Sequence, residues 1–173
     1  MKKTTKYILS ASFAAIIAVF AQIAFPLPSG IPVTLQTFAV ALCGFLLSYL
    51  FGTLSVAVYI LLGLIGLPVF SAFGGGPSVL FGTTGGFLWG FLLLVFFCAL
   101  SEKIAKNYLK FGIITLGILL CHLCGILQFA IVYNTGLGRA FIIVSLPYLL
   151  KDFICVFGAF YLAKLIKRRI KIF

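Results

Sequence analysis

Long apolar runs, separated by short turn-forming or basic segments, set the pattern of this chain. From Tyr7 to Ser101, a stretch of 95 residues, no Asp, Glu, Lys, Arg or His occurs. One transmembrane helix needs about 20 apolar residues, so this stretch has room for three or four helices. The pattern predicts an all-α, polytopic membrane protein that forms one domain over residues 1–173.

Clusters of proline, glycine and polar residues mark the predicted ends of the helices. The breaks are expected at 26–32, 68–86, 101–110 and 134–139. The apolar run between the first two breaks is too long for one helix, so it is expected to hold two. Six helices are predicted. The first covers about 8–25, and the second and third share 33–67 and meet at a turn in 48–53. The fourth follows residue 86 and ends at about 100, the fifth covers 111–133, and the sixth begins at about 147.

The basic residues predict how these helices are oriented. Three lysines precede the uncharged stretch and three follow it, at 103–110. Basic loops prefer the cytoplasm, so an even number of crossings must separate the two clusters, and we count four. With two more helices, both termini are expected in the cytoplasm of a multi-pass plasma (inner) membrane protein. Of the 13 Lys and Arg residues, only Arg139 and Lys151 are then expected outside.

Composition excludes a water-soluble domain. The chain is 64% hydrophobic and 9% charged, with a mean hydropathy of +1.30, whereas soluble domains are about 45–50% apolar and 25% charged. A net charge of +11 could suggest nucleic acid as a partner. The basic residues instead lie in short clusters between apolar runs, so we expect membrane lipid and not nucleic acid around this protein.

The irregular and polar features gather on the predicted outer side. Backbone without regular structure is tolerated at membrane depth only where it is buried or lines a cavity. Segment 74–86 is rich in glycine but also contains Val79, Leu80 and Phe81. It is therefore expected to be a re-entrant or lid-like outer loop between helices 3 and 4 that forms a pocket wall. The alternative is a disordered connecting loop.

Two polar residues lie inside apolar segments. Asp152 is expected about 7–8 Å into the sixth helix, and an intramembrane carboxylate is a candidate for function. Its alternative role is a simple ion pair with Lys151 or Arg139. Gln36 lies in the opening turns of the second helix, and its alternative role is an interhelical hydrogen bond.

The sequence indicates neither a metal site nor an enzyme active site. Cys121, His122 and Cys124 resemble a metal motif, but helical periodicity does not bring the three side chains onto one face. Small apolar cysteines and a neutral histidine in a helix core are the favoured interpretation. Nucleotide-cradling, hydrolase and zinc-protease motifs do not occur in the sequence. We therefore expect no metal, no cofactor and no catalytic residues, and we expect that the chain is not an enzyme.

Three blocks of sequence resemble one known family. They are Pro32-Val-Thr-Leu-Gln-Thr37, then Gly66-Leu-Pro-Val-Phe70 with Gly82-Thr-Thr-Gly-Gly-Phe87, and Pro147-Tyr148 with Asp152. Together they resemble the BioY family, the biotin-specific substrate-binding (S) components of energy-coupling factor (ECF) transporters. The resemblance covers essentially the whole chain. It implies a six-helix subunit that captures biotin outside and delivers it inward with a coupling transmembrane subunit and two ATPase subunits.

The resemblance also implies functional residues. Asp152 would accept hydrogen bonds from the ligand. The residues that would line and close the site are Gln36, Tyr148, Gly75, Gly76, Ser78, Thr84 and Gly85. A small-residue stripe on helix 1, Ala11 and Ala15, would contact the coupling subunit, although the same stripe could pack within the bundle.

The chain departs from the family pattern near its carboxylate. Cys155 stands where the family commonly has lysine, and Lys151 stands where a small residue is usual. Thr83 occupies a position that is often proline in the family.

Two other functions stay open from the sequence. One is a self-sufficient facilitator or ion-coupled carrier that uses Asp152 as a proton site, and the other is a membrane enzyme.

Overall fold

The computed structural model describes residues 3–25 and 32–170, and its architecture is all-α, as the sequence predicts. Besides the helices it contains a short antiparallel pair, β1 (Ala24–Phe25) with β2 (Val33–Thr34), and one 3-10 turn, η1 (Ser71–Phe73). The α-helices are α1 (Lys3–Gln22), α2 (Gln36–Leu46), α3 (Tyr49–Leu64), α4 (Pro77–Leu80), α5 (Gly85–Ser101), α6 (Asn107–Val132), α7 (Leu137–Val144) and α8 (Leu146–Arg169).

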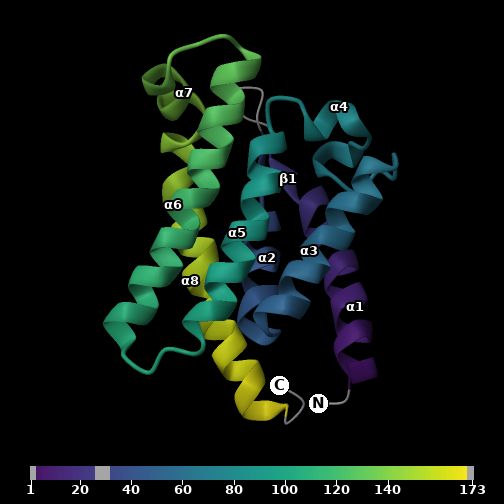
Figure 1. Cartoon of the computed structure of the whole chain (residues 1–173), viewed down its shortest axis with the longest axis vertical. Helices are drawn as coiled ribbons and strands as arrows, with labels where there is room; N and C mark the ends of the chain where they lie inside the picture. The colour runs from purple at the N-terminus through teal and green to yellow at the C-terminus, as the bar shows by residue number, and fades with distance from the viewer. Residues whose placement is uncertain (1–2, 26–31, 171–173) are drawn as a thin grey trace.

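The long helices form one bundle. Helices α6 and α8 lie on one side and α1 and α3 on the other, with α2 and α5 between them (Figure 1). The start of α1 and the end of α8 lie at the same end of the bundle. The opposite end carries α4, α7 and the β1–β2 pair. Regular helices thus fill one end, and the irregular segments collect at the other.

By length and composition, two or three helices among the described residues are candidate membrane spans. Helices α1 and α6, with 20 and 26 residues, are long and apolar enough, and the pair α7 and α8, bent by 52°, would add a third. Helices α2, α3 and α5 are apolar but have only 11, 16 and 17 residues. The six predicted helices are therefore all present in order, and three are shorter than a full span of about 20 residues.

The boundary between the first two helices was wrongly predicted. Helix α1 ends at Gln22 and not at Phe25, and α2 starts at Gln36 and not at Val33. The intervening residues pair as strands, because the Ile23 carbonyl accepts a hydrogen bond from the Leu35 N–H (3.2 Å) next to the β1–β2 ladder. Most of the proline-rich break, residues 26–31, lies outside the described residues.

Three further boundaries differ from the prediction. The turn between α2 and α3 is shorter than expected, since α3 already begins at Tyr49. Helix α6 starts at Asn107 instead of residue 111, because its polar first turn continues the helix. The predicted turn at 134–139 is present only in its first half, because α7 begins at Leu137, where the Ala140 N–H donates to the Gly136 carbonyl oxygen.

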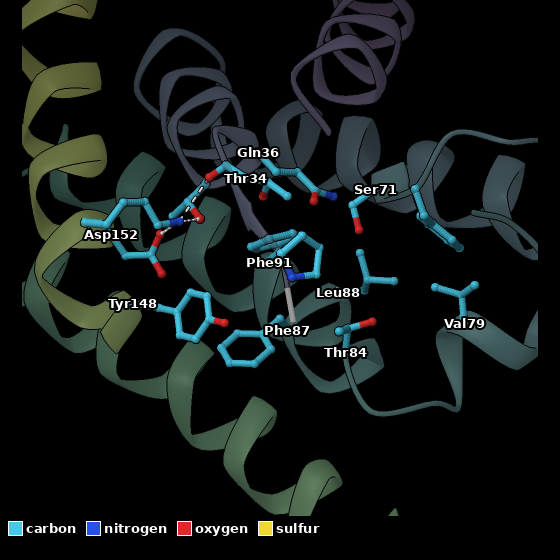
Figure 2. Close-up of a pocket in the computed structure, with 14 residues that line it drawn as sticks. Thr34, Gln36, Ser71, Val79, Thr84, Phe87, Leu88, Phe91, Tyr148 and Asp152 are labelled. Carbon is cyan, nitrogen blue, oxygen red and sulfur yellow. Dashed lines mark hydrogen bonds and ion pairs between the residues drawn. The ribbon is translucent and has the colours of Figure 1, made fainter. Parts of the chain in front are cut away.

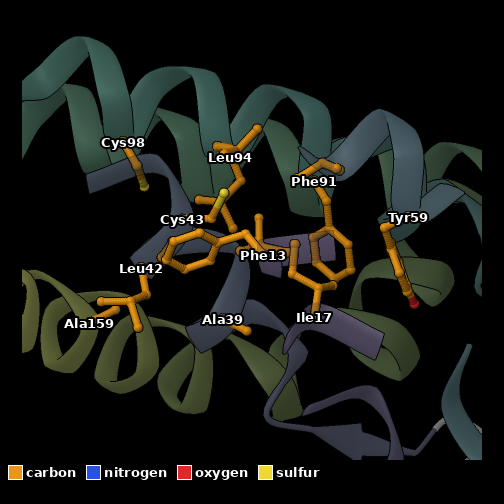
Figure 3. Close-up of a cluster of buried hydrophobic side chains, with 14 of the residues drawn as sticks. Phe13, Ile17, Ala39, Leu42, Cys43, Tyr59, Phe91, Leu94, Cys98 and Ala159 are labelled. Atoms are coloured by element: carbon orange, nitrogen blue, oxygen red, sulfur yellow. The ribbon is translucent and has the colours of Figure 1, made fainter. Parts of the chain in front are cut away.

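Small residues let the central helices approach closely. A Cβ on Gly90 would lie 2.8 Å from the Cys121 Cα, and one on Gly86 would lie 2.3 Å from the Cys124 carbonyl oxygen. Small residues four apart, as here on α5, are typical of close helix packing in membranes. In the core, Cys43 and Cys98 likewise pack among large apolar side chains (Figure 3). The cysteines therefore serve as small apolar residues, as the sequence suggests.

Candidate ligand-binding site

A cavity opens toward the irregular end of the bundle. It is bordered by β2 and the start of α2, loop 68–86, the start of α5 and the start of α8 (Figure 2). Its empty volume is about 590 Å³, including some open solvent at its mouth. Helix α2 makes room for it, because 11 residues span only about 16 Å at 1.5 Å per residue.

Aromatic side chains form much of the cavity wall. Phe87 and Phe91 come from α5, Phe70 from the loop that follows α3, and Tyr148 from the first turn of α8. Tyr148 and Phe70 are buried. A wall of this kind, with a few polar groups placed in it, suits a ligand that has an apolar body and specific hydrogen-bonding groups.

Asp152 is the carboxylate of the cavity. It lies less than two turns from the start of α8 and is 6% exposed. Its Oδ2 lies 3.1 Å from His122 Nε2, and its Oδ1 forms an ion pair with Lys151 Nζ. The ion pair considered from the sequence is therefore present, and the same carboxylate also faces the cavity.

Lys151 lines the cavity as well. Its Nζ donates to the Thr34 carbonyl oxygen (3.1 Å) and lies 3.5 Å from Thr37 Oγ1. Adjacent helix positions point about 100° apart, but the long stem of lysine carries its ammonium group back to the carboxylate. The bonds to Thr34 and Thr37 also fasten α8 to β2 and α2. Cys155, by contrast, is buried and is not among the lining residues.

Gln36 forms an interhelical hydrogen bond, the alternative role considered from the sequence, and it also lines the cavity. Its amide donates to the Tyr59 hydroxyl (2.5 Å), which joins α2 to α3, and both residues are buried. Gln36 also lines the cavity, next to Thr37 of the same helix. The interhelical hydrogen bond therefore fixes a residue that is still part of the cavity wall.

Loop 68–86 forms a wall of the cavity, as predicted. Phe70, Ser71, Val79 and Thr84 line it, and Leu80 is fully buried. A glutamine at each side holds the loop backbone. The Gln22 amide of α1 lies 3.0 Å from the Phe70 carbonyl oxygen, and the Gln128 amide of α6 lies 2.6 Å from that of Gly82. These contacts exclude the alternative of a freely solvated connecting loop.

The predicted site residues divide into two groups. Asp152, Gln36, Tyr148 and Thr84 line the cavity together. The other four are not among the lining residues: Gly75, Gly76, Ser78 and Gly85.

Backbone geometry accounts for the glycines of the second group. A Cβ on Gly85 would lie 1.8 Å from the Leu80 carbonyl oxygen, and one on Gly75 would lie 2.5 Å from that of Leu67. Gly76 has a φ of +86°, which favours glycine. Ser78 is exposed. These residues shape the loop that carries Thr84 and Val79 to the cavity.

The sequence did not predict that His122 contacts the carboxylate of the cavity. Its ring bridges Asp152 and Ser145, with His122 Nδ1 2.9 Å from Ser145 Oγ. The only sequence signal was a histidine within an apolar helix, and its partners lie 23 and 30 residues away. Ser, His and Asp can form a catalytic set, but neither Ser145 nor His122 lines the cavity, and Ser145 is fully buried. Groups of three or more potential metal ligands do not occur among the described residues.

The two alanines of the predicted coupling stripe lie on the surface. Ala11 and Ala15 are exposed on α1, whereas Ala14 is buried against the bundle. Both residues of the stripe therefore face away from the bundle, and only the neighbouring Ala14 packs inside it.

Comparisons with known proteins identify the family. The sequence model of the BioY family matches residues 1–172. The chain belongs to the BioY family. It is 38% identical over 159 residues to the biotin transporter BioY of Thermotoga maritima, covering 90% of this chain and 92% of that one. It is 33% identical to the probable biotin transporter BioY of Pyrococcus horikoshii, covering 88% and 90%.

A solved structure shares the fold of this BioY chain. It is the crystal structure of the S-component for biotin from an ECF-type ABC transporter, and the TM-score is 0.85. The match covers 97% of this chain and 95% of the other, at 23% sequence identity. The helical arrangement described above is thus the fold of that S-component, and the BioY chain is a membrane transport protein by family.

Proposed function

We propose that this BioY chain is the substrate-binding subunit of an ECF-type transporter and that its ligand is biotin. The observation that carries the proposal is the cavity beside Asp152, in which a buried carboxylate shares the lining with four aromatic side chains and several polar ones. Biotin has a ureido ring with two N–H donors, an apolar body and a carboxylate-bearing tail. The curated relatives that cover most of the chain carry the name biotin transporter.

The polar groups of the cavity suit the ureido ring. An ionised carboxylate accepts hydrogen bonds and does not donate them, so Asp152 would accept from a ring N–H. The aromatic wall of Phe87, Phe91 and Tyr148 would surround the bicyclic body. Gln36, Tyr148 and Thr84 would complete the contacts. Gly75, Gly76, Ser78 and Gly85 would act through the loop that closes over the ligand.

The proposed subunit crosses the plasma membrane six times, with both termini in the cytoplasm. Support comes from charge placement, since Lys103, Lys106 and Lys110 follow α5 and Lys164 and Lys167 lie near the end of α8. The start of α1 and the end of α8 share one end of the bundle (Figure 1), which suits an even number of crossings. The cavity then opens outward.

Transport would require partner subunits. The sequence offers no nucleotide-binding motif, so ATP hydrolysis would come from two ATPase subunits joined by a coupling transmembrane subunit. The exposed Ala11 and Ala15 of α1 would dock against that subunit, where small residues permit close helix contact.

Uptake into proteoliposomes tests this division of labour. The chain alone should bind labelled biotin but not accumulate it, whereas vesicles that also contain the coupling and ATPase subunits should accumulate it when ATP is supplied. Accumulation by the chain alone, driven by a proton gradient, would contradict the proposal and favour a self-sufficient carrier. Chemical conversion of the ligand would favour a membrane enzyme.

A further inference from the structure

His122 connects three parts of the molecule at the back of the cavity. It is the single histidine of the chain, lies within α6 and is 3% exposed. Its Nε2 is 3.1 Å from Asp152 Oδ2 on α8, and its Nδ1 is 2.9 Å from Ser145 Oγ at the bend between α7 and α8. Phe87, which lines the cavity, packs edge-on against the imidazole at 5.6 Å between ring centroids.

The partners of the ring determine where its proton lies. An ionised carboxylate only accepts hydrogen bonds, so Nε2 carries a proton and donates it to Asp152. Lys151 already pairs with this carboxylate, and a second cation in the apolar core would be a buried charge without compensation. The imidazole is therefore neutral, and its Nδ1 accepts a hydrogen bond from the Ser145 hydroxyl.

We propose that His122 is a positioning residue for ligand binding, which holds Oδ2 of Asp152 so that Oδ1 receives the donor groups of the ligand. The inference rests on the proposed function, since it concerns the same cavity. Asp152 lines the cavity, whereas His122 and Ser145 lie behind it. Oδ1 is buried and pairs with the Lys151 ammonium. A carboxylate oxygen has two lone-pair sites, so Oδ1 keeps one acceptor site for a ligand donor beside that ammonium.

Substitutions of His122 by two amides test the role of its Nε2. In His122→Gln the side-chain amide reaches the place of Nε2, and in His122→Asn it reaches only the place of Nδ1. We expect His122→Gln to keep the affinity for biotin within about threefold, and His122→Asn to weaken it about tenfold, the factor for one hydrogen bond to a charged group. Both are compared as folded, monodisperse proteins in detergent. Equal affinities for the two variants would overturn the proposal.

A double-mutant cycle shows whether His122 acts through the carboxylate. In an Asp152→Asn background, the further change His122→Asn should alter biotin affinity by less than about twofold, because the group that His122 positions has already lost its charge. If the losses in binding free energy caused by the two substitutions add, His122 acts independently of Asp152 and the proposal is wrong.

A spectroscopic measurement without ligand provides the independent check. Because the chain has one histidine, nitrogen NMR of 15N-histidine-labelled protein reports this imidazole alone. The proposal predicts a neutral ring with its proton on Nε2, and the same tautomer in Ser145→Ala, because the Asp152 carboxylate still accepts from Nε2. A proton on Nδ1 in the unsubstituted protein would overturn it. Failure of the unsubstituted protein to bind biotin would instead overturn the proposed function, so the two failures are distinguishable.

Discussion

Gln36 shows how one buried residue can serve both packing and binding. Its amide bonds the Tyr59 hydroxyl on the neighbouring helix, and its side chain also faces the cavity. Tyr59 is fully buried, so its hydroxyl would lose its partner if Gln36 were replaced by an apolar residue. The structural and binding roles can therefore be separated only by changing each partner in turn.

The matched pair Tyr59→Phe and Gln36→Leu separates these roles. Tyr59→Phe removes the interhelical hydrogen bond but keeps the Gln36 amide in the cavity, so biotin affinity should change by less than about threefold. Gln36→Leu also removes the cavity amide, and affinity should fall roughly two- to tenfold, as for one neutral hydrogen bond. Calorimetric titration of both folded variants measures the difference. Equal affinities would assign Gln36 to packing alone.

The sequence predicted only part of the candidate site at the scale of single residues. Asp152 and Gln36 could be found because a polar group inside an apolar run is costly and needs a reason. No role was assigned to His122, and for Lys151 only the ion pair with Asp152 was considered. Their other contacts depend on partners brought together by folding: Asp152 and Ser145 for His122, Thr34 and Thr37 for Lys151. Position along the chain carries no direct signal for such contacts.

At the scale of elements, α1 links the surface of the bundle to the loop over the cavity. Its outward face carries the exposed Ala11 and Ala15, and its end carries Gln22. Gln22 bonds the loop backbone through the Phe70 carbonyl oxygen and also accepts from the Phe73 N–H (2.9 Å). A partner docked on α1 would therefore lie on the same helix that holds one side of loop 68–86.

Tryptophan substitutions on two faces of α1 test the docking surface. Ala15→Trp adds bulk to an exposed position, so biotin binding by the isolated protein should stay nearly unchanged while co-purification with the coupling subunit and ATP-driven uptake are lost. Ala14→Trp is the matched control. Its side chain is 1% exposed, so overpacking should destabilise the fold by about 1–3 kcal/mol. If Ala15→Trp also destabilises the protein, the stripe serves internal packing.

The predictability of each element followed from its size and composition. Apolar runs and proline or glycine breaks were enough to predict the six long helical segments, because helix-spanning runs are strong signals. The pairing of β1 with β2 was missed, since two residues per strand leave no periodic pattern. Helix α7 was missed because its eight residues follow directly after a turn-forming segment.

At the scale of the whole molecule, charge and shape point to the same orientation. The basic residues near the ends of α5 and α8 gather at one end of the bundle, and Glu102 there pairs with Lys110 and Lys167. The cavity and the irregular loops lie at the other end. Basic clusters favour the cytoplasm, so the proposed orientation places the cavity on the outer side.

Reporter fusions test this orientation. A reporter after Phe173 and one inserted near Asn107 should both read cytoplasmic, because each lies among basic residues. A reporter at Gly75, in the loop over the cavity, should read external. A cytoplasmic signal at Gly75 or an external one at Asn107 would contradict six crossings with both termini inside.

The central claim is that biotin binds in the cavity at the carboxylate of Asp152. Titration calorimetry on purified protein in detergent, comparing the unsubstituted chain with Asp152→Ala, tests it most directly. A hydrogen bond to a charged group contributes about 1.5–3 kcal/mol, so Asp152→Ala should weaken biotin binding roughly 10- to 100-fold while the protein stays folded. Binding of biotin by the unsubstituted chain with no change in Asp152→Ala, or no binding at all, would contradict the account.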